Sequence, residues 1–185
     1  MTALIIIIVL LVVLIGGYIF FYNNLQTARV NTEESWSQID VQLQRRNDLI
    51  PNLVETTKGY AKHERETLDE VVSLRNQLIE LPADAHQEKM EISNQLTDAL
   101  KSIFALSENY PDLKASQQFS QLQEELTNTE NKIAYSRQLF NSSAALFNKK
   151  LVTFPSNLVA KMSHLSKIDY LQAPTAAKEV PTVHF

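Results

Sequence analysis

The sequence predicts an all-α protein: an antiparallel helical bundle of three long helices and a short fourth, behind an N-terminal transmembrane helix. Three observations support this fold class. The 185 residues include 3 glycines, too few for the many tight turns of β-sandwiches and barrels. After residue 22 the apolar side chains recur at steps of three and four, the spacing of a helix that buries one face. Pro82, Pro111 and Pro155 divide this pattern into segments.

The chain begins with an uninterrupted apolar run from Ala3 to Tyr22. Twenty helical residues at about 1.5 Å each cover roughly 30 Å, the thickness of the hydrocarbon core of a bilayer. A cleaved signal peptide is the alternative, but two residues precede the run, neither is basic, and no A-x-A site follows. We therefore expect a retained single-pass anchor in a bacterial cell membrane, in contact with the lipid bilayer through residues 3–22.

The orientation of this anchor is predicted from the nearest basic side chain. Arg29 is the first basic residue after the apolar run, and Arg45 and Arg46 lie farther along. The positive-inside rule counts charges close to the span. It therefore favours a cytoplasmic C-terminal domain, although this prediction depends on Arg29 alone.

The first segment after the anchor, residues 24–81, reads as one very long amphipathic helix. Its apolar stripe includes Trp36, which we expect to be a core anchor; binding a partner is the alternative. Pro51 removes a backbone donor inside the segment, so we expect a kink there, with a clean break at Ile50 as the alternative. Gly59 costs helix propensity, and close packing of another helix would explain it.

The remaining elements follow from the same spacing. We expect a second helix over about 83–109, a third from about residue 112 or 116 to Val152, and a short fourth over 157–165 with Ser156 as its cap. The third has a heptad-like stripe. Short connections favour folding back within one chain over a dimeric coiled coil. The predicted domains are the anchor (1–22), the bundle (23–172) and an irregular C-terminal tail (173–185).

Several blocks of the sequence carry a family resemblance. Residues 35–43 read S-W-S-Q-I-D-V-Q-L, residues 45–56 read R-R-N-D-L-I-P-N-L-V-E-T, and residues 58–64 read K-G-Y-A-K-H-E. Residues 110–115 read Y-P-D-L-K-A and residues 154–160 read F-P-S-N-L-V-A. In this order the blocks resemble the LemA family of bacterial membrane proteins, and the resemblance covers essentially the whole chain. It implies a single-pass anchor followed by an antiparallel helical bundle.

The resemblance implies little about activity, because the family has no settled biochemical function; some members are linked to the formation of membrane organelles. Three positions depart from the family pattern: Ser35 replaces Ala, Gln44 replaces Lys, and Phe140 replaces Tyr. The loss of Lys at position 44 reduces the positive charge beside Arg45 and Arg46. That weakens the case for an anionic partner there.

No motif in the chain predicts catalysis, so we expect no enzyme, no cofactor and no metal. The absence of Cys excludes disulfides, thiol nucleophiles and thiolate metal sites. Three glycines cannot form a phosphate-binding loop. His63 and Glu64 begin an H-E-x-x-H pattern, but position 67 is Thr in place of the second zinc ligand. A net charge of -4 gives no case for nucleic acid.

The matched blocks contain charged residues that we expect to meet between helices. Arg45, Arg46 and Asp48 share one helical neighbourhood, and Glu130 and Arg137 lie seven residues apart on the third helix. We predict that some of them form a hydrogen-bonded ion network that sets helix register. Solvated surface charges with partners on the same helix are the alternative.

The predicted function is that of a noncatalytic, membrane-tethered scaffold or assembly factor, acting on an unidentified protein partner or through self-association. The alternative is an envelope sensor or signalling adaptor that transmits motion through the first helix and Pro51. Direct membrane remodelling would require a basic amphipathic surface helix. Residues 157–165 carry Lys161 and His164, which makes that segment a poor candidate for such a helix.

Overall fold

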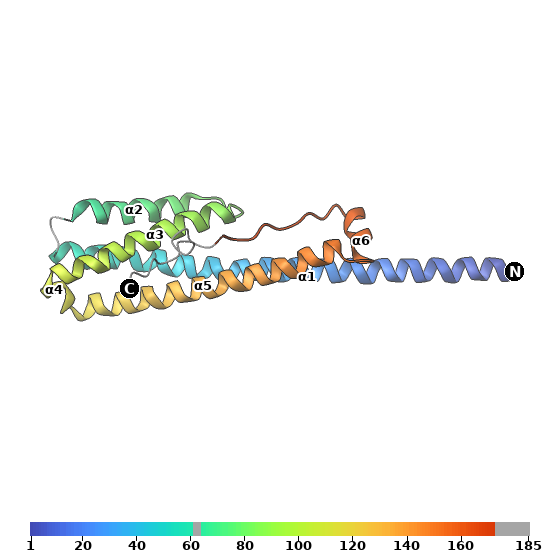
Figure 1. Ribbon diagram of the computed structural model, residues 1–185, viewed down its shortest axis with the longest axis horizontal. Helices are drawn as coiled ribbons and strands as arrows, with labels where there is room; N and C mark the ends of the chain where they lie inside the picture. The colour runs from blue at the N-terminus through green and yellow to red at the C-terminus, as the bar shows by residue number, and fades with distance from the viewer. Residues whose placement is uncertain (61–63, 173–185) are drawn as a thin grey trace, which may run out of the picture. The chain divides into compact units, whose positions relative to one another are not determined.

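The computed structural model describes residues 1–60 and 64–172, and over these ranges the chain is helical with no strand. The all-α fold class is therefore confirmed (Figure 1). The elements are α1 (Thr2–Tyr60), α2 (Arg65–Glu80), α3 (His86–Leu106), the short 3-10 helix η1 (Ser107–Asn109), α4 (Pro111–Lys114), α5 (Gln117–Val152) and α6 (Ser156–Met162). The predicted tail, 173–185, lies outside the described residues.

The single helix predicted over 24–81 is wrong, because it is two helices. α1 ends at Tyr60 and α2 begins at Arg65. Both α1 and α2 carry apolar residues at helical spacing in the sequence. This spacing indicates helix but does not indicate where one helix ends and the next begins. Gly59, which weakens the end of α1, was the available signal for the break. The other long helices agree with prediction: α3 and α5 correspond to the second and third.

The clean break considered at Ile50 does not occur, since Pro51 lies inside α1 and the helix continues for nine more residues. The short fourth helix is present as α6, but Ser156 does not cap it. Ser156 is its first residue, and its Oγ lies 2.6 Å and 2.8 Å from the carbonyl oxygens of Lys150 and Thr153.

The contacts divide the chain into two compact units, and both α1 and α5 pass through each of them. Among the described residues, the four-helix unit comprises 38–136 and 171–172. It contains the end of α1, then α2, α3 and the beginning of α5. Leu68, Val71, Leu74 and Leu78 form the buried stripe of α2. The ring of Phe104 meets that of Phe119 edge to face, with centroids 6.3 Å apart.

The anchor unit comprises residues 1–37 and 137–170. It contains the beginning of α1, the end of α5, and α6. Trp36 is buried and meets Phe140 edge to face, with ring centroids 6.0 Å apart. Beside this ring pair, the hydroxyls of Ser35 and Ser143 lie 3.0 Å apart. These contacts join α1 to α5 within this unit.

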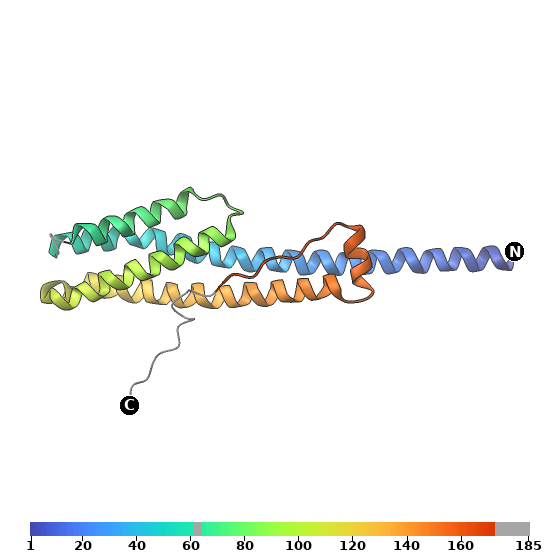
Figure 2. The same cartoon turned by 45° about the horizontal axis from the view of Figure 1, so that its top comes forward.

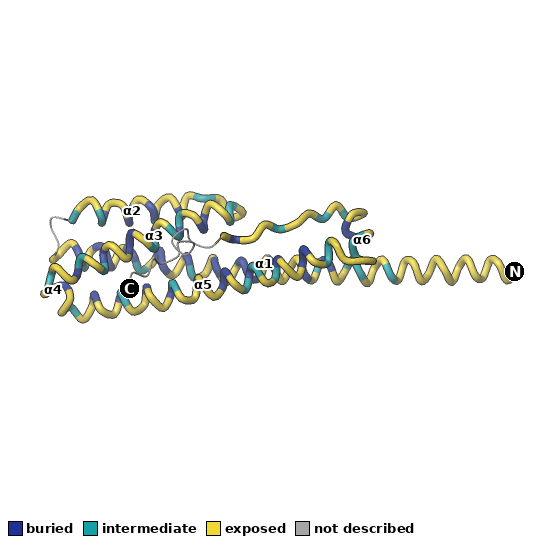
Figure 3. The backbone as a smooth tube through the Cα atoms, in the orientation of Figure 1, coloured by how far each residue is buried: buried dark blue, intermediate teal, exposed yellow. Residues whose placement is uncertain are grey.

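The first part of α1 is apolar, and none of the residues that the structure describes covers it. The large side chains between Leu4 and Ile15 are all more than half exposed (Figure 3). In the described part of the chain, α1 is the one helix that is long and apolar enough to cross a bilayer. An exposed apolar surface of this extent is unfavourable in water. It fits a membrane-anchored protein.

Candidate functional site

The centre of the four-helix unit contains a fully buried arginine. The Nη1 of Arg46 donates to the carboxylate Oε2 of Glu130 and to the hydroxyl oxygen of Thr97, both at 3.0 Å. Its Nη2 donates to the hydroxyl oxygen of Ser93 at 2.5 Å. The side chain of Arg46 is 1% exposed and that of Glu130 is 35% exposed. We call these four residues the Arg46 cluster.

The Arg46 cluster joins three helices, because Arg46 lies on α1, Ser93 and Thr97 lie on α3, and Glu130 lies on α5. Ser93 and Thr97 are four residues apart and therefore share one face of α3. The planar guanidinium suits this arrangement, since its five donors spread in a fixed fork. An unpaired buried charge would destabilise the unit strongly, so the partners must be in place when the helices pack.

Further charged contacts surround the cluster on α1. The Nζ of Lys89 on α3, itself a buried residue, donates to Asp40 at 3.1 Å. Arg45 approaches Glu125 of α5 at 3.7 Å, where both side chains are about half exposed. The Nε of Arg75 on α2 donates to the backbone carbonyl of Asn47 at 2.9 Å. Each of these contacts crosses from α1 to a different helix.

The five residues of the predicted network are placed differently. Arg46 and Glu130 form a salt bridge within the four-helix unit. Arg45 pairs with Glu125 at the surface, and Asp48 accepts a hydrogen bond from Gln44 on its own helix. Arg137 is buried and belongs to the anchor unit. The proposal that such contacts set helix register stays a prediction.

Some participants were missed by sequence analysis. Ser93, Thr97 and Lys89 were not singled out, because a Ser, Thr or Lys in a helix is ordinarily a surface residue. Asn148 was not missed: from the sequence it could line a polar seam or face water, and water was slightly favoured. In the structure Asn148 is buried in the anchor unit and exchanges two hydrogen bonds with the backbone of Ile168: its Nδ2 donates at 2.8 Å and its Oδ1 accepts at 2.9 Å. The remaining signal in the sequence was the position of these residues on apolar stripes.

The close packing predicted at Gly59 is wrong for the part of the chain that the structure describes. Gly59 is exposed, and a Cβ built on it would meet no atom within 4 Å. Glycine is therefore not required there for space. Its effect is on helix propensity, one residue before α1 ends.

His86 lies at the start of α3, near the contact between Lys89 and Asp40. Burial lowers the pKa of His86 below its ordinary value of 6.5, and the positive charge of Lys89 lowers it further. Asp84 and Asp40 act in the opposite direction. The net effect favours the neutral imidazole in the folded protein.

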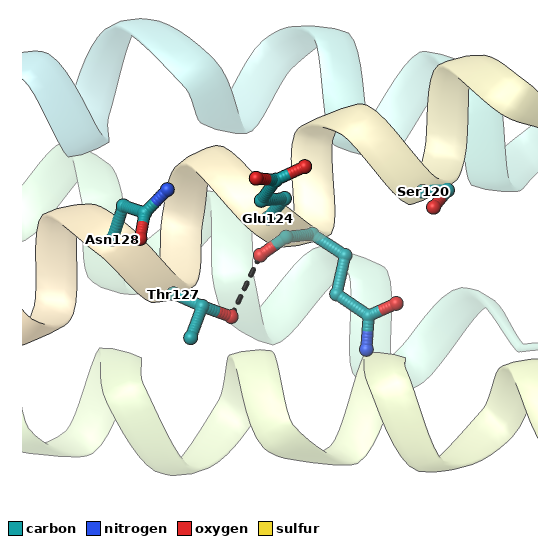
Figure 4. Close-up of a pocket in the computed structure, with 5 residues that line it drawn as sticks. Ser120, Glu124, Thr127 and Asn128 are labelled. Carbon is teal, nitrogen blue, oxygen red and sulfur yellow. Dashed lines mark hydrogen bonds between the residues drawn. The ribbon is translucent and has the colours of Figure 1, made fainter.

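A shallow hollow on α5 is lined by Ser120, Gln123, Glu124, Thr127 and Asn128, all from one helix (Figure 4). The hydroxyl of Thr127 donates to the backbone carbonyl of Gln123 at 2.7 Å. Within residues 1–60 and 64–172, no three His, Asp or Glu side chains gather in a way that could hold a metal ion. His63 lies outside these ranges.

These observations define a class of protein: an all-helical chain with an exposed apolar N-terminal helix, in which a buried arginine cluster joins helices. The chain belongs to the LemA family, whose model matches residues 35–185. It is 28% identical over 151 residues to Protein LemA of Metamycoplasma hominis, an alignment that covers 82% of this chain and 68% of that protein.

Magnetosome proteins are also similar. The chain is 24% identical over 179 residues to Magnetosome protein MamQ of Magnetospirillum gryphiswaldense, and 26% identical over 179 residues to Magnetosome protein MamQ 2 of Paramagnetospirillum magneticum. Each alignment covers 84% of this chain and 66% of the relative. The chain thus spans about two thirds of the length of these relatives.

Proposed function

We propose that this protein is a noncatalytic scaffold or assembly factor, held in a bacterial cell membrane by residues 3–22 and acting through protein contacts. The observation that carries the proposal is the Arg46 cluster. The arginine is 1% exposed and its donors meet side chains of neighbouring helices. A charge that is buried and paired in this way has no access to a substrate, and we expect it to specify which side chains of the helices meet.

The relatives support a role at membranes. Two of them are named magnetosome proteins, and this chain shares with them a family and most of its length. The partner is an unidentified protein or a second copy of the chain, for instance through a coiled coil. The position of Arg29 beyond the apolar run supports a cytoplasmic bundle. Reporter fusions at the C-terminus test that orientation.

The experiment is purification of the tagged full chain from gently solubilised membranes after crosslinking in cells. We expect a stoichiometric partner or a homo-oligomer. A matched control carries the same tag on a chain with Glu130→Ala, which disturbs the Arg46 cluster and leaves the anchor unchanged. Recovery of monomer alone from the natural chain, with a tag that captures it efficiently, would contradict the proposal.

A second candidate, a sensor or signalling adaptor, is supported by the continuity of α1. This one helix connects the apolar run to the four-helix unit without interruption at Pro51. A sensor that works through Pro51 requires that Pro51→Ala change the cellular output while the fold is retained. A scaffold requires no such effect. The output is measured as the change in transcript levels after envelope stress, in cells carrying either form.

A further inference from the structure

α6 packs against α1 where the apolar run ends. Leu25 of α1 forms a buried cluster with Val159 and Ala160 of α6, and Phe21 and Tyr22 pack against it. One turn earlier, the hydroxyls of Tyr18 and Ser163 lie 3.4 Å apart. Figures 1 and 2 both show α6 lying on α1 at this level. If residues 3–22 cross the hydrocarbon core, α6 lies at the level of the lipid headgroups.

The other side of α6 is apolar and exposed. Leu158 and Met162, four residues apart, share a face of the helix and are 52% and 69% exposed. Phe154, in the turn before α6, is 76% exposed. The helix therefore has two apolar sides: one is covered by α1, and the other is exposed and covered by none of the described residues. Exposed side chains of this size are costly in water and stable at a membrane interface.

The charge around α6 has one sign. Residues 149–167 contain Lys149, Lys150, Lys161 and Lys167 and no Asp or Glu, in a chain whose net charge is -4. Lys150 donates to Asn24 of α1, two residues beyond the apolar run. Lys149, Lys161 and Lys167 are exposed. Lysines near an anionic leaflet are attracted to its acidic headgroups, and each of them strengthens membrane binding.

We propose that the corner formed by residues 149–167 docks on the anionic surface of the bilayer that α1 crosses. Phe154, Leu158 and Met162 enter the interfacial layer, and the lysines contact acidic headgroups. This inference rests on the membrane anchor of the proposed function. By its own sequence, the segment 157–165 is a poor membrane-remodelling helix, because Lys161 and His164 are its basic residues. The fold adds the lysines of α5, the exposed apolar side, and the position beside the anchor.

The test uses the natural absence of Cys, which allows single spin labels on the full chain. One label is placed at Leu158→Cys and a control label at Ile79→Cys, which lies on α2 in the four-helix unit. The two natural side chains have the same size and are each 52% exposed. The chain is reconstituted into vesicles containing phosphatidylglycerol. We expect the label at position 158 to be several-fold more accessible to oxygen, relative to a water-soluble nickel complex, than the label at position 79. Equal, water-like accessibility at both positions would overturn the proposal.

Two further measurements distinguish lipid contact at position 158 from failure of the membrane anchor and from contact with a second copy. A label at Ile8→Cys reports on the anchor itself: if it is also in water, the proposed membrane anchor fails, and if it alone is in lipid, the docking inference fails. Nanodiscs holding one chain each remove chain–chain contact. If the oxygen preference of the label at position 158 is present in vesicles and lost in these nanodiscs, the exposed side of α6 contacts a second copy of the chain. That result would overturn lipid docking. Replacing Lys149, Lys161 and Lys167 by Gln should lower the oxygen preference at position 158, whereas Arg replacements should retain it.

Discussion

Arg46 illustrates how one residue can specify a helical packing. Its guanidinium meets three side chains from two helices, and Thr97 lies within 3.0 Å of both Arg46 and Glu130. Apolar stripes alone allow helices to slide by a turn at modest cost, because one leucine replaces another. A buried charge does not allow this, since a shifted register would leave it without its acceptors. We therefore expect the cluster to contribute specificity of packing even where its net contribution to stability is small.

This asymmetry predicts unequal effects of removing the two charged partners. Glu130→Ala leaves the fully buried Arg46 without its counter-ion and should lower the free energy of unfolding by about 2–4 kcal/mol. Arg46→Met fills the space and leaves a partly exposed carboxylate that water can solvate, so it should cost less, about 1.5 kcal/mol or below. Thermal unfolding followed by circular dichroism in detergent measures both.

Glu125→Ala on the same helix is the control for that pair. Its contact with Arg45 spans 3.7 Å between half-exposed side chains, and such pairs contribute less than about 1 kcal/mol. Equal losses from Glu125→Ala and Glu130→Ala would contradict the role assigned to the Arg46 cluster.

His86 makes stability depend on pH in a defined direction. Its pKa is lowered in the folded protein by burial and by Lys89, so the unfolded chain takes up a proton first as the pH falls below 6.5. Stability should therefore decline from pH 6.5 downwards, until the lower folded pKa is passed. His86→Gln should reduce the decline of the unfolding midpoint between pH 7.5 and 5.5. His164→Gln, at an exposed position, is the control, and an identical decline in the natural chain and His86→Gln would contradict this effect.

At the scale of helices, sequence periodicity identified most of the fold. The prolines and the heptad-like stripe located α3, α5 and α6. The break after α1 was missed, because a stripe at steps of three and four continues in α2 after the chain has changed direction. Partners such as Ser93 and Lys89 could not be identified either. Ser93 follows its partner Arg46 by 47 positions, and Lys89 follows Asp40 by 49 positions. Contacts over such separations depend on tertiary packing.

The open surroundings of Gly59 predict a stabilising substitution. Gly59→Ala adds a Cβ that meets no described atom within 4 Å and improves the propensity of the last turn of α1. The free energy of unfolding should rise by about 0.5–1 kcal/mol. Chemical denaturation of the full chain in detergent measures it, with the exposed Glu55→Ala on the same helix as a reference expected to stay within about 0.5 kcal/mol. A clear loss at Gly59→Ala would show that a neighbour occupies this space.

At the scale of the whole chain, the apolar run predicts how the protein behaves in membranes. The natural chain should stay in the membrane pellet after extraction with alkaline carbonate, because a spanning helix is not removed by pH or salt. A chain lacking residues 2–17 keeps Tyr18, Phe21 and Tyr22, which contact α6 or its cluster, and should be released. Immunoblots of pellet and supernatant measure this, and release of the natural chain would exclude the anchor.

The composition of the Arg46 cluster also bears on how the four-helix unit opens. Its four residues come from α1, α3 and α5, and none comes from α2. With 16 residues, α2 is also shorter than α3 and α5. Amide hydrogens of α2 should therefore exchange with deuterium sooner than those of α3, because α2 can detach without breaking the Arg46 cluster. Such a local opening would expose the inner side of α2 and the groove that α2 leaves. A binding protein could contact this surface without global unfolding of the chain.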